Sequence, residues 1–135
     1  MFSELIFKDI RMAMKSVLII EDCLDIRENI SELLELRGYL VFSAANGKIG
    51  LEMATNHLPD IILCDVLMPE MNGNLVFSAL RSSELTRHIP FLFISSSTEK
   101  KDIQLALSKG VNGYIQKPFD DDLLFTTIED CLRGV

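Results

Sequence analysis

The sequence predicts a single α/β domain built around a parallel β-sheet that helices cover on both faces. Five short apolar runs recur along the chain, and none of them alternates with polar residues. Such runs are typical of strands that are buried on both faces. The segments between them carry apolar residues at helical spacing. At 135 residues, the chain is long enough to bury such a core as one domain.

The predicted strands are short and are separated by segments long enough to hold a helix. The fifth strand has the weakest apolar pattern of the five. The strands cover Val17–Ile20, Tyr39–Phe42, Ile61–Cys64, Phe91–Ile94 and Gly113–Gln116. Strands that alternate with helical patterns in this way indicate successive βα units and a parallel sheet.

Helical patterns follow the strands. The first places Ile26, Ile30 and Leu34 on one face, and Gly38 offers a stop. Asp120 can cap the last helix with its side-chain oxygen. The other helix-face positions are Leu33 in the first helix, Val76, Ala79 and Leu80 after Gly73, Ile103, Ala106 and Leu107 before Gly110, and Leu123, Leu124, Ile128 and Cys131 in the last.

Five consecutive βα units joined by right-handed crossovers fold into a doubly wound sheet. For five units the common strand order is 2-1-3-4-5, the flavodoxin-like arrangement with helices on both faces. We place this domain at residues 15–135. Residues 1–14 are an N-terminal extension of uncertain structure, either a short amphipathic helix or sequence read from an upstream start. Charges at Glu4, Lys8, Asp9 and Arg11 argue against a signal peptide.

Composition argues against several classes of function. With a net charge of −7, the chain lacks the excess of Lys and Arg that direct nucleic-acid binding needs. The three cysteines form no CxxC pair and no Cys/His cluster, which argues against zinc and suits reduced thiols in a cytoplasmic protein. The apolar runs of four or five residues are too short to cross a membrane.

Carboxylates follow two of the predicted strands at the point where the strand order reverses. Ligands of doubly wound sheets bind there, at the carboxyl ends of the first and third strands. Glu21 and Asp22 follow the first strand, and Asp65 follows the third. At an effective dielectric of about 20, two carboxylates about 4 Å apart repel each other by roughly 4 kcal/mol. We therefore expect two cations, Lys117 after the fifth strand and a divalent metal, and oxygen-only ligands favour Mg²⁺.

Four motifs carry a resemblance to a known family. They are VLIIED, ILCDVLMPEMNG, IPFLFISSS and GVNGYIQKPF. In this order and spacing they resemble the receiver domains of response regulators, the phospho-acceptor proteins of two-component signalling. The resemblance covers about residues 15 to 133, and its most specific elements are D-x-x-M-P-x-M-x-G and the Lys-Pro-Phe ending.

The resemblance implies a role for each residue of the crevice. Asp65 is the nucleophile that takes a phosphoryl group from a phosphohistidine or a small phosphodonor. Lys117 pairs with one phosphoryl oxygen, and Ser95 donates its hydroxyl to another. Phosphoryl transfer needs mainly such positioning and charge neutralisation. The implied ligands of Mg²⁺ are Glu21, Asp22, Asp65 and the backbone carbonyl of Leu67.

The resemblance also implies a conformational switch rather than a turnover enzyme. Ser95 is drawn to the phosphoryl group and the ring of Tyr114 then moves inward. The Lys117–Pro118 peptide bond is cis in the family. The side chains of Leu67 and Ser97 flank the water that hydrolyses the acyl phosphate. The protein catalyses only its own phosphorylation and dephosphorylation.

Three other interpretations compete with this one. A haloacid-dehalogenase-type phosphatase needs a second Asp two residues after its nucleophile, where this chain has Leu67. A flavodoxin-like nucleotide or flavin module needs a Gly/Ser/Thr-rich phosphate cradle after the first strand, where this chain is anionic. A pseudo-receiver that only binds a partner usually lacks the Asp or the Lys, and both are present.

The implied partners are proteins of a phosphorelay. The phosphoryl donor is a sensor histidine kinase or a histidine phosphotransfer protein. The output is a downstream protein partner or a domain on a longer chain. The last helix, Asp120–Leu132, lacks the basic pattern of the DNA-binding winged-helix branch. A homodimer through the face of this helix stays open, as do the cognate kinase and the pathway.

Overall fold

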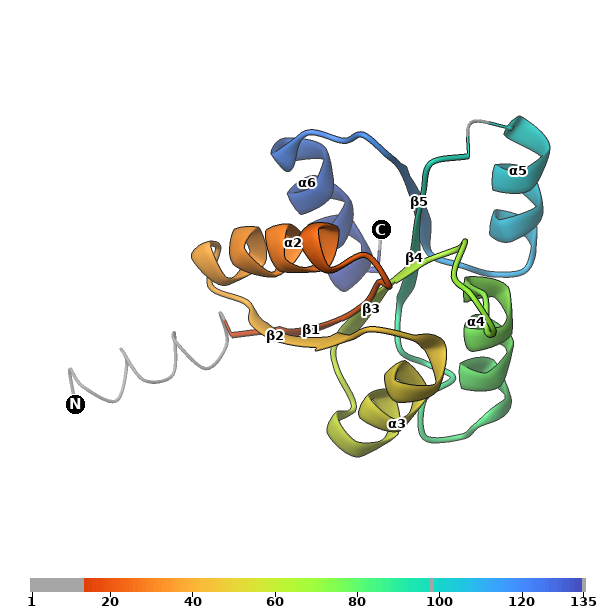
Figure 1. Cartoon of the computed structure of the whole chain (residues 1–135). Coiled ribbons are helices and arrows are strands. Elements are labelled where there is room, and N and C mark those ends of the chain that lie inside the picture. The colour runs from red at the N-terminus through yellow and green to blue at the C-terminus, as the bar shows by residue number, and fades with distance from the viewer. Residues whose placement is uncertain (1–13, 98, 135) are drawn as a thin grey trace.

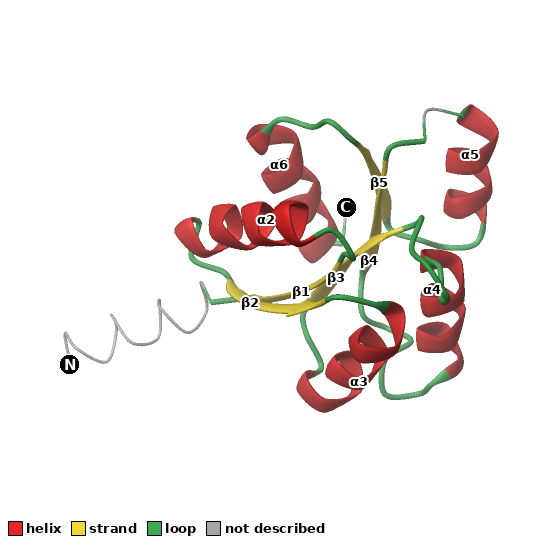
Figure 2. Cartoon of the chain, in the orientation of Figure 1, coloured by secondary structure: helices red, strands yellow, loops and turns green. Residues whose placement is uncertain are grey.

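The computed structural model describes residues 14–97 and 99–134. Strands and helices alternate along this part of the chain (Figure 2). The strands are β1 (Ser16–Ile20), β2 (Leu40–Ala44), β3 (Ile61–Asp65), β4 (Phe91–Ser95) and β5 (Gly113–Gln116). The helices are α2 (Leu24–Leu36), α3 (Gly47–His57), α4 (Gly73–Ser82), α5 (Lys100–Ser108) and α6 (Asp121–Leu132). The expected N-terminal extension, residues 1–14, lies outside the described residues apart from Met14.

The five strands form one parallel sheet in the order β2-β1-β3-β4-β5, which confirms the predicted fold class. Helices α2 and α6 cover one face, and α3, α4 and α5 cover the other (Figure 1). Side chains alternate between the two cores along each inner strand. In β3, Ile62 and Cys64 join the core under α3, α4 and α5, whereas Ile61 and Leu63 join the core under α2 and α6.

The second strand differs from its predicted bounds. It runs from Leu40 to Ala44 instead of Tyr39 to Phe42. The Tyr39 N–H donates to the Leu34 carbonyl at 3.0 Å, so Tyr39 belongs to the turn that follows α2 and not to the strand. The strands β3 and β4 are buried on both faces, as the apolar runs predict. The strand β2 lies at an edge of the sheet and is partly exposed. An edge strand needs less apolar character, and its signal in the sequence is therefore weaker.

Side-chain caps fix the starts of three helices. The predicted cap, Asp120, accepts a hydrogen bond from the Leu123 N–H at 2.7 Å. Asn46 and Asn72 cap α3 and α4 in the same way. Within residues 14–97 and 99–134, none of the helices combines the length and the apolar character needed to span a bilayer.

Gly73 joins the core to the turn that follows β3. Its N–H donates to the Val66 carbonyl at 2.9 Å. A Cβ atom at this position would lie 2.5 Å from the Asp65 carbonyl oxygen and 2.9 Å from the Phe93 ring. The backbone at Asp65 and the start of α4 can approach this closely only because residue 73 has no side chain.

We predict that Gly73→Ala lowers the free energy of unfolding by about 1–3 kcal/mol, the usual cost of overpacking a tight site. Ser78→Ala is the matched control, because Ser78 lies exposed in the same helix. Urea denaturation of both variants measures the difference. Equal stability of the two variants would contradict the close packing of Gly73 on the Asp65 backbone.

Candidate functional site

The three predicted carboxylates meet at the carboxyl ends of β1 and β3. Glu21 directly follows β1, where its N–H donates to the Ala44 carbonyl, and its side chain is buried. Asp22 is exposed, and Asp65 is the buried last residue of β3. One oxygen from each of the three carboxylates lies within 4.8 Å of the others. We call Glu21, Asp22 and Asp65 the acidic cluster.

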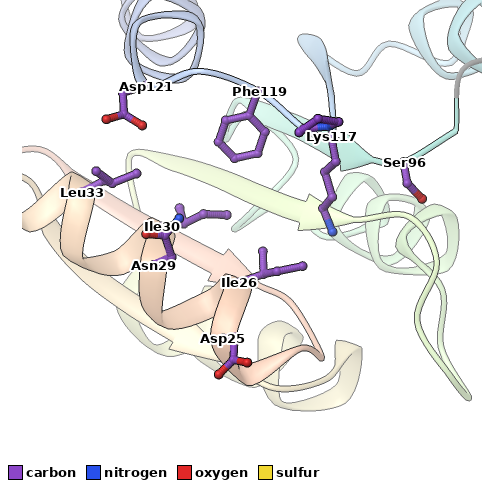
Figure 3. A pocket seen from close by; sticks show the side chains of 10 residues that line it. Asp25, Ile26, Asn29, Ile30, Leu33, Ser96, Lys117, Phe119 and Asp121 are labelled. Atoms are coloured by element: carbon purple, nitrogen blue, oxygen red, sulfur yellow. The ribbon is translucent and has the colours of Figure 1, made fainter.

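Lys117 reaches the acidic cluster from the end of β5. Its Nζ lies 2.9 Å from Glu21 Oε1 and 3.4 Å from Asp65 Oδ2. The Lys117–Pro118 peptide bond is cis, the isomer that the resemblance implies. Figure 3 shows the Lys117 side chain extended from the segment after β5 toward the carboxyl ends of the neighbouring strands.

A groove of about 480 Å³ opens beside Lys117. Figure 3 shows Ile26 and Ile30 of α2 on one side of the groove and Phe119 on the other. Asp25 and Asp121 add carboxylates to its lining. The groove thus reaches Lys117 from the side of α2 and α6, and Glu21, Asp22 and Asp65 are not part of its lining.

Burial and repulsion change the proton affinity of the cluster. The pKa of Glu21 is raised to about 7, mainly by burial and further by contact with Asp65, while Lys117 opposes the rise. For Lys117, burial lowers the pKa, but the contacts with Glu21 and Asp65 outweigh burial and leave the pKa raised. Lys117 therefore stays protonated and neutralises part of the cluster.

The acidic cluster has the chemistry of a magnesium site. Glu21 Oε2 is buried, and it has no hydrogen-bond partner among the described residues. A buried polar atom without a partner is costly and rare, and a bound cation would satisfy it. The three side chains offer only oxygen atoms, the ligands that Mg²⁺ prefers. The residues present therefore fit this ion.

The predicted switch residues lie beside the cluster rather than in it. Ser95, the last residue of β4, is fully buried, and its Oγ accepts a hydrogen bond from the Ser97 N–H at 3.1 Å. Tyr114 of β5 is half-buried and packs edge-on against Phe93 with the ring centroids 6.3 Å apart. Tyr114, Leu67 and Ser97 line a cavity of about 240 Å³.

Leu67 lies at the opening of the site. Its side chain is 65% exposed, and its N–H donates to Asp65 Oδ1 at 3.3 Å. An apolar group in this position has no proton to give, so the chemistry of an aspartate-nucleophile phosphatase lacks its acid.

Two residues that the sequence analysis did not single out also contact the site. Arg27 donates to the Glu21 carbonyl at 2.7 Å, and Asp102 accepts a hydrogen bond from Ser97 Oγ at 3.1 Å. Both contacts depend on the path of a turn. The sequence around Arg27 and Asp102 carries no motif that signals them.

Comparison with known proteins identifies the family. The model of the response regulator receiver domain matches residues 17–129 of the chain. The chain belongs to this family. Receiver domains are signalling switches of two-component systems that accept a phosphoryl group, and they are not enzymes in the ordinary sense.

Three relatives illustrate the match. The response regulator PleD of Caulobacter vibrioides is 38% identical over 112 residues, which are 81% of this chain and 25% of PleD. The chain thus spans about a quarter of the length of that relative. The chemotaxis protein CheY4 of Vibrio cholerae superposes with a TM-score of 0.83 at 32% identity, over 88% of this chain and 99% of its own.

The third relative carries a metal ion. The receiver domain of the sensor histidine kinase PA1611 of Pseudomonas aeruginosa superposes with a TM-score of 0.82 at 26% identity, over 90% of this chain and 99% of its own. Its structure holds a magnesium ion coordinated in the active-site cleft.

We predict opposite effects on stability from the two kinds of charge in this receiver site. In metal-free buffer, Lys117→Met should lower the free energy of unfolding by about 2 kcal/mol, because it leaves buried carboxylates without their cation. Asp65→Asn should leave stability equal or higher, because it removes one of the mutually repelling carboxylates. Urea denaturation in the presence of a chelator measures both. A larger loss in Asp65→Asn than in Lys117→Met would contradict this account.

Proposed function

We propose that this receiver domain is a phosphorylation-dependent switch whose phosphoryl acceptor is Asp65. The observation that carries the proposal is the convergence of Lys117 with the acidic cluster, in a chain that belongs to the receiver family. The receiver domain is assigned to residues 15–135, with residues 1–14 as an extension.

In this reaction an Asp65 carboxylate oxygen attacks the phosphorus of a phosphohistidine or a small phosphodonor. The new bond between the Asp65 oxygen and phosphorus forms an acyl phosphate, and the bond to the donor nitrogen or oxygen breaks with its electron pair. In the proposed reaction Lys117 pairs with an oxygen of the transferred group, and its ammonium lies 3.4 Å from Asp65 Oδ2, which supports this role. Catalysis is then mainly positioning and neutralisation of charge.

Glu21, Asp22, Asp65 and the backbone carbonyl of Leu67 would hold Mg²⁺, which when bound neutralises charge on the phosphoryl oxygens. The oxygen-only donor set and the unpartnered Glu21 Oε2 support this assignment. Arg27 supports the same turn, because its guanidinium fixes the Glu21 carbonyl while the carboxylate faces the cluster.

The conformational change runs through Ser95 and Tyr114. Ser95 Oγ accepts one hydrogen bond and keeps its own proton, which it can donate to a phosphoryl oxygen. Movement of Ser95 and its loop toward Asp65 would let the Tyr114 ring enter the adjoining cavity of about 240 Å³. The surface formed by β5 and α5 then changes shape, and this change is the signal.

The partners of this switch are a sensor histidine kinase or histidine phosphotransfer protein and a downstream target. The match covers nearly all of CheY4, whereas PleD is about four times as long as its matched part. The target is therefore either a separate protein or an output domain on a longer chain. With a net charge of −7, the receiver domain itself does not bind nucleic acid.

A phosphorylation assay tests the acceptor. We expect acetyl phosphate with Mg²⁺ to label the wild-type protein and Glu35→Ala, an exposed acid near the end of α2 that lies outside the acidic cluster and the groove beside Lys117. Asp65→Ala should not be labelled, and a chelator should abolish labelling of the wild type. Intact-mass spectrometry reads the result. Labelling of Asp65→Ala at the wild-type rate would sink the proposed function.

The lifetime of the acyl phosphate is a second measurable property. The Leu67 side chain cannot orient water by hydrogen bonding, and in the phosphorylated protein its bulk would partly cover the phosphorus. We expect Leu67→Asn to shorten the lifetime about fivefold, a barrier change of about 1 kcal/mol. Leu67→Met, which keeps an apolar side chain of similar size, is the control and should decay at the wild-type rate. Decay of both variants at one rate would show that access at this position does not set the lifetime.

A further inference from the structure

We propose that Asp102 is a positioning residue of the switch, which holds Ser97 and thereby the Ser95 hydroxyl in the unphosphorylated arrangement. This inference rests on the proposed function of Asp65 and Ser95. It assigns to α5 a direct part in how readily Ser95 reaches the phosphoryl group. We call the two hydrogen bonds that join Ser95, Ser97 and Asp102 the serine latch.

The serine latch consists of contacts present in the structure. Ser97 N–H donates to Ser95 Oγ at 3.1 Å, and Ser97 Oγ–H donates to Asp102 Oδ2 at 3.1 Å. The Ser97 hydroxyl also accepts from the Glu99 N–H at 3.4 Å. Ser97 therefore links the end of β4 to the first turn of α5. The position of the Ser95 oxygen depends on where α5 holds Ser97.

Because of the strand order, the hydrogen bond between Ser97 and Asp102 opposes the movement of Ser95 toward Asp65. Asp65 ends β3, Ser95 ends the neighbouring β4, and α5 packs against β5 on the far side of β4. Ser97 thus lies between Asp65 and α5. A movement of Ser95 and its loop toward a phosphoryl group on Asp65 carries Ser97 away from α5 and breaks its hydrogen bond to Asp102.

The cavity beside Tyr114 points to the same role. Ser97 and Asp102 both line it, together with Ala106 of α5. Their hydrogen bond joins two of its walls, the loop after β4 and the helix α5. As long as this bond is made, the walls are held at their present separation. The inward movement of Tyr114 and the release of the serine latch are therefore parts of one transition.

Removal of the serine latch should favour the phosphorylated arrangement, because only the unphosphorylated arrangement contains it. The probe is beryllofluoride at fixed Mg²⁺, which occupies the acceptor site and is not hydrolysed like an acyl phosphate. Calorimetric titration of the full chain gives its dissociation constant. We expect Asp102→Ala and Ser97→Ala each to bind beryllofluoride about three- to fivefold more tightly than the wild type, as befits one partly exposed hydrogen bond.

Two controls separate the serine latch from a general effect on α5. Glu99→Ala removes the same charge at the same helix end, where the Glu99 side chain makes no capping hydrogen bond, and its affinity should match the wild type. Asp102→Asn keeps an acceptor oxygen and should stay within about twofold of the wild type. The double variant Asp102→Ala/Ser97→Ala should bind no more tightly than either single variant, because both remove one contact.

The outcomes are distinct. Unchanged or weaker binding by the two alanine variants would overturn the serine latch, as would a gain of equal size in Glu99→Ala or additive gains in the double variant. A merely structural role of Asp102 would lower the melting temperature and weaken binding, and it would not strengthen it. If wild type does not bind beryllofluoride, or Asp65→Ala binds it equally well, the proposed function fails and the inference fails with it.

Discussion

The ion pairs of Lys117 with Glu21 and Asp65 connect the ends of three strands. β1 and β3 are neighbours in the sheet, but β5 is separated from β3 by β4. Only a long side chain spans this distance, and the Lys117 ammonium reaches both carboxylates. The backbone at this position is fixed as well, because the Lys117 N–H donates to the Ser95 carbonyl at 2.8 Å. The cation that balances the acidic cluster is thus held by the strand that ends in Ser95.

The acidic cluster also depends on the tight packing of the surrounding backbone. Asp65 is buried, so its position depends on the core rather than on solvent. Cys64 beside it is fully buried under α3, α4 and α5, and Gly73 brings the start of α4 against the Asp65 carbonyl. Each of these contacts limits where the carboxylate can lie. A flexible cluster of acids would spread apart under its own repulsion, whereas here the scaffold keeps the carboxylates together.

Much of this arrangement could be predicted from the sequence, for a definable reason. Parallel strands that are covered on both faces leave apolar runs, and the order of five βα units places Glu21, Asp22 and Asp65 at one edge of the sheet. The bounds of β2 were less predictable, because the apolar run begins at Tyr39, which belongs to the turn after α2 and not to the strand. The sequence also has no feature that distinguishes buried Glu21 from its exposed neighbour Asp22.

The contacts that escaped prediction involve turns. Arg27 binds the backbone carbonyl of Glu21. Every residue has a backbone carbonyl, so nothing in the sequence marks this one as a partner. Ser97 and Asp102 meet because the loop after β4 turns back onto α5, and serine and aspartate five residues apart have many other ways to lie. Sequence patterns report which residues are buried and at what period. They do not report the course of a loop, and the coupling between Ser95 and α5 depends on that course.

Leu67 and Ser97 connect two properties of the proposed switch. These are the equilibrium between its two arrangements and the lifetime of the phosphoryl group. Both residues line the cavity beside Tyr114, and in the proposed switch both flank the approach of water to the acyl phosphate. The equilibrium between the two arrangements depends on where α5 holds Ser97. In the same proposal, the lifetime of the phosphoryl group depends on how far Leu67 and Ser97 cover phosphorus. Because Ser97 contributes to both, a shift of α5 by a bound partner would alter the equilibrium and the rate of hydrolysis together. A partner that binds α5 would in this way change the duration of the signal without touching Asp65.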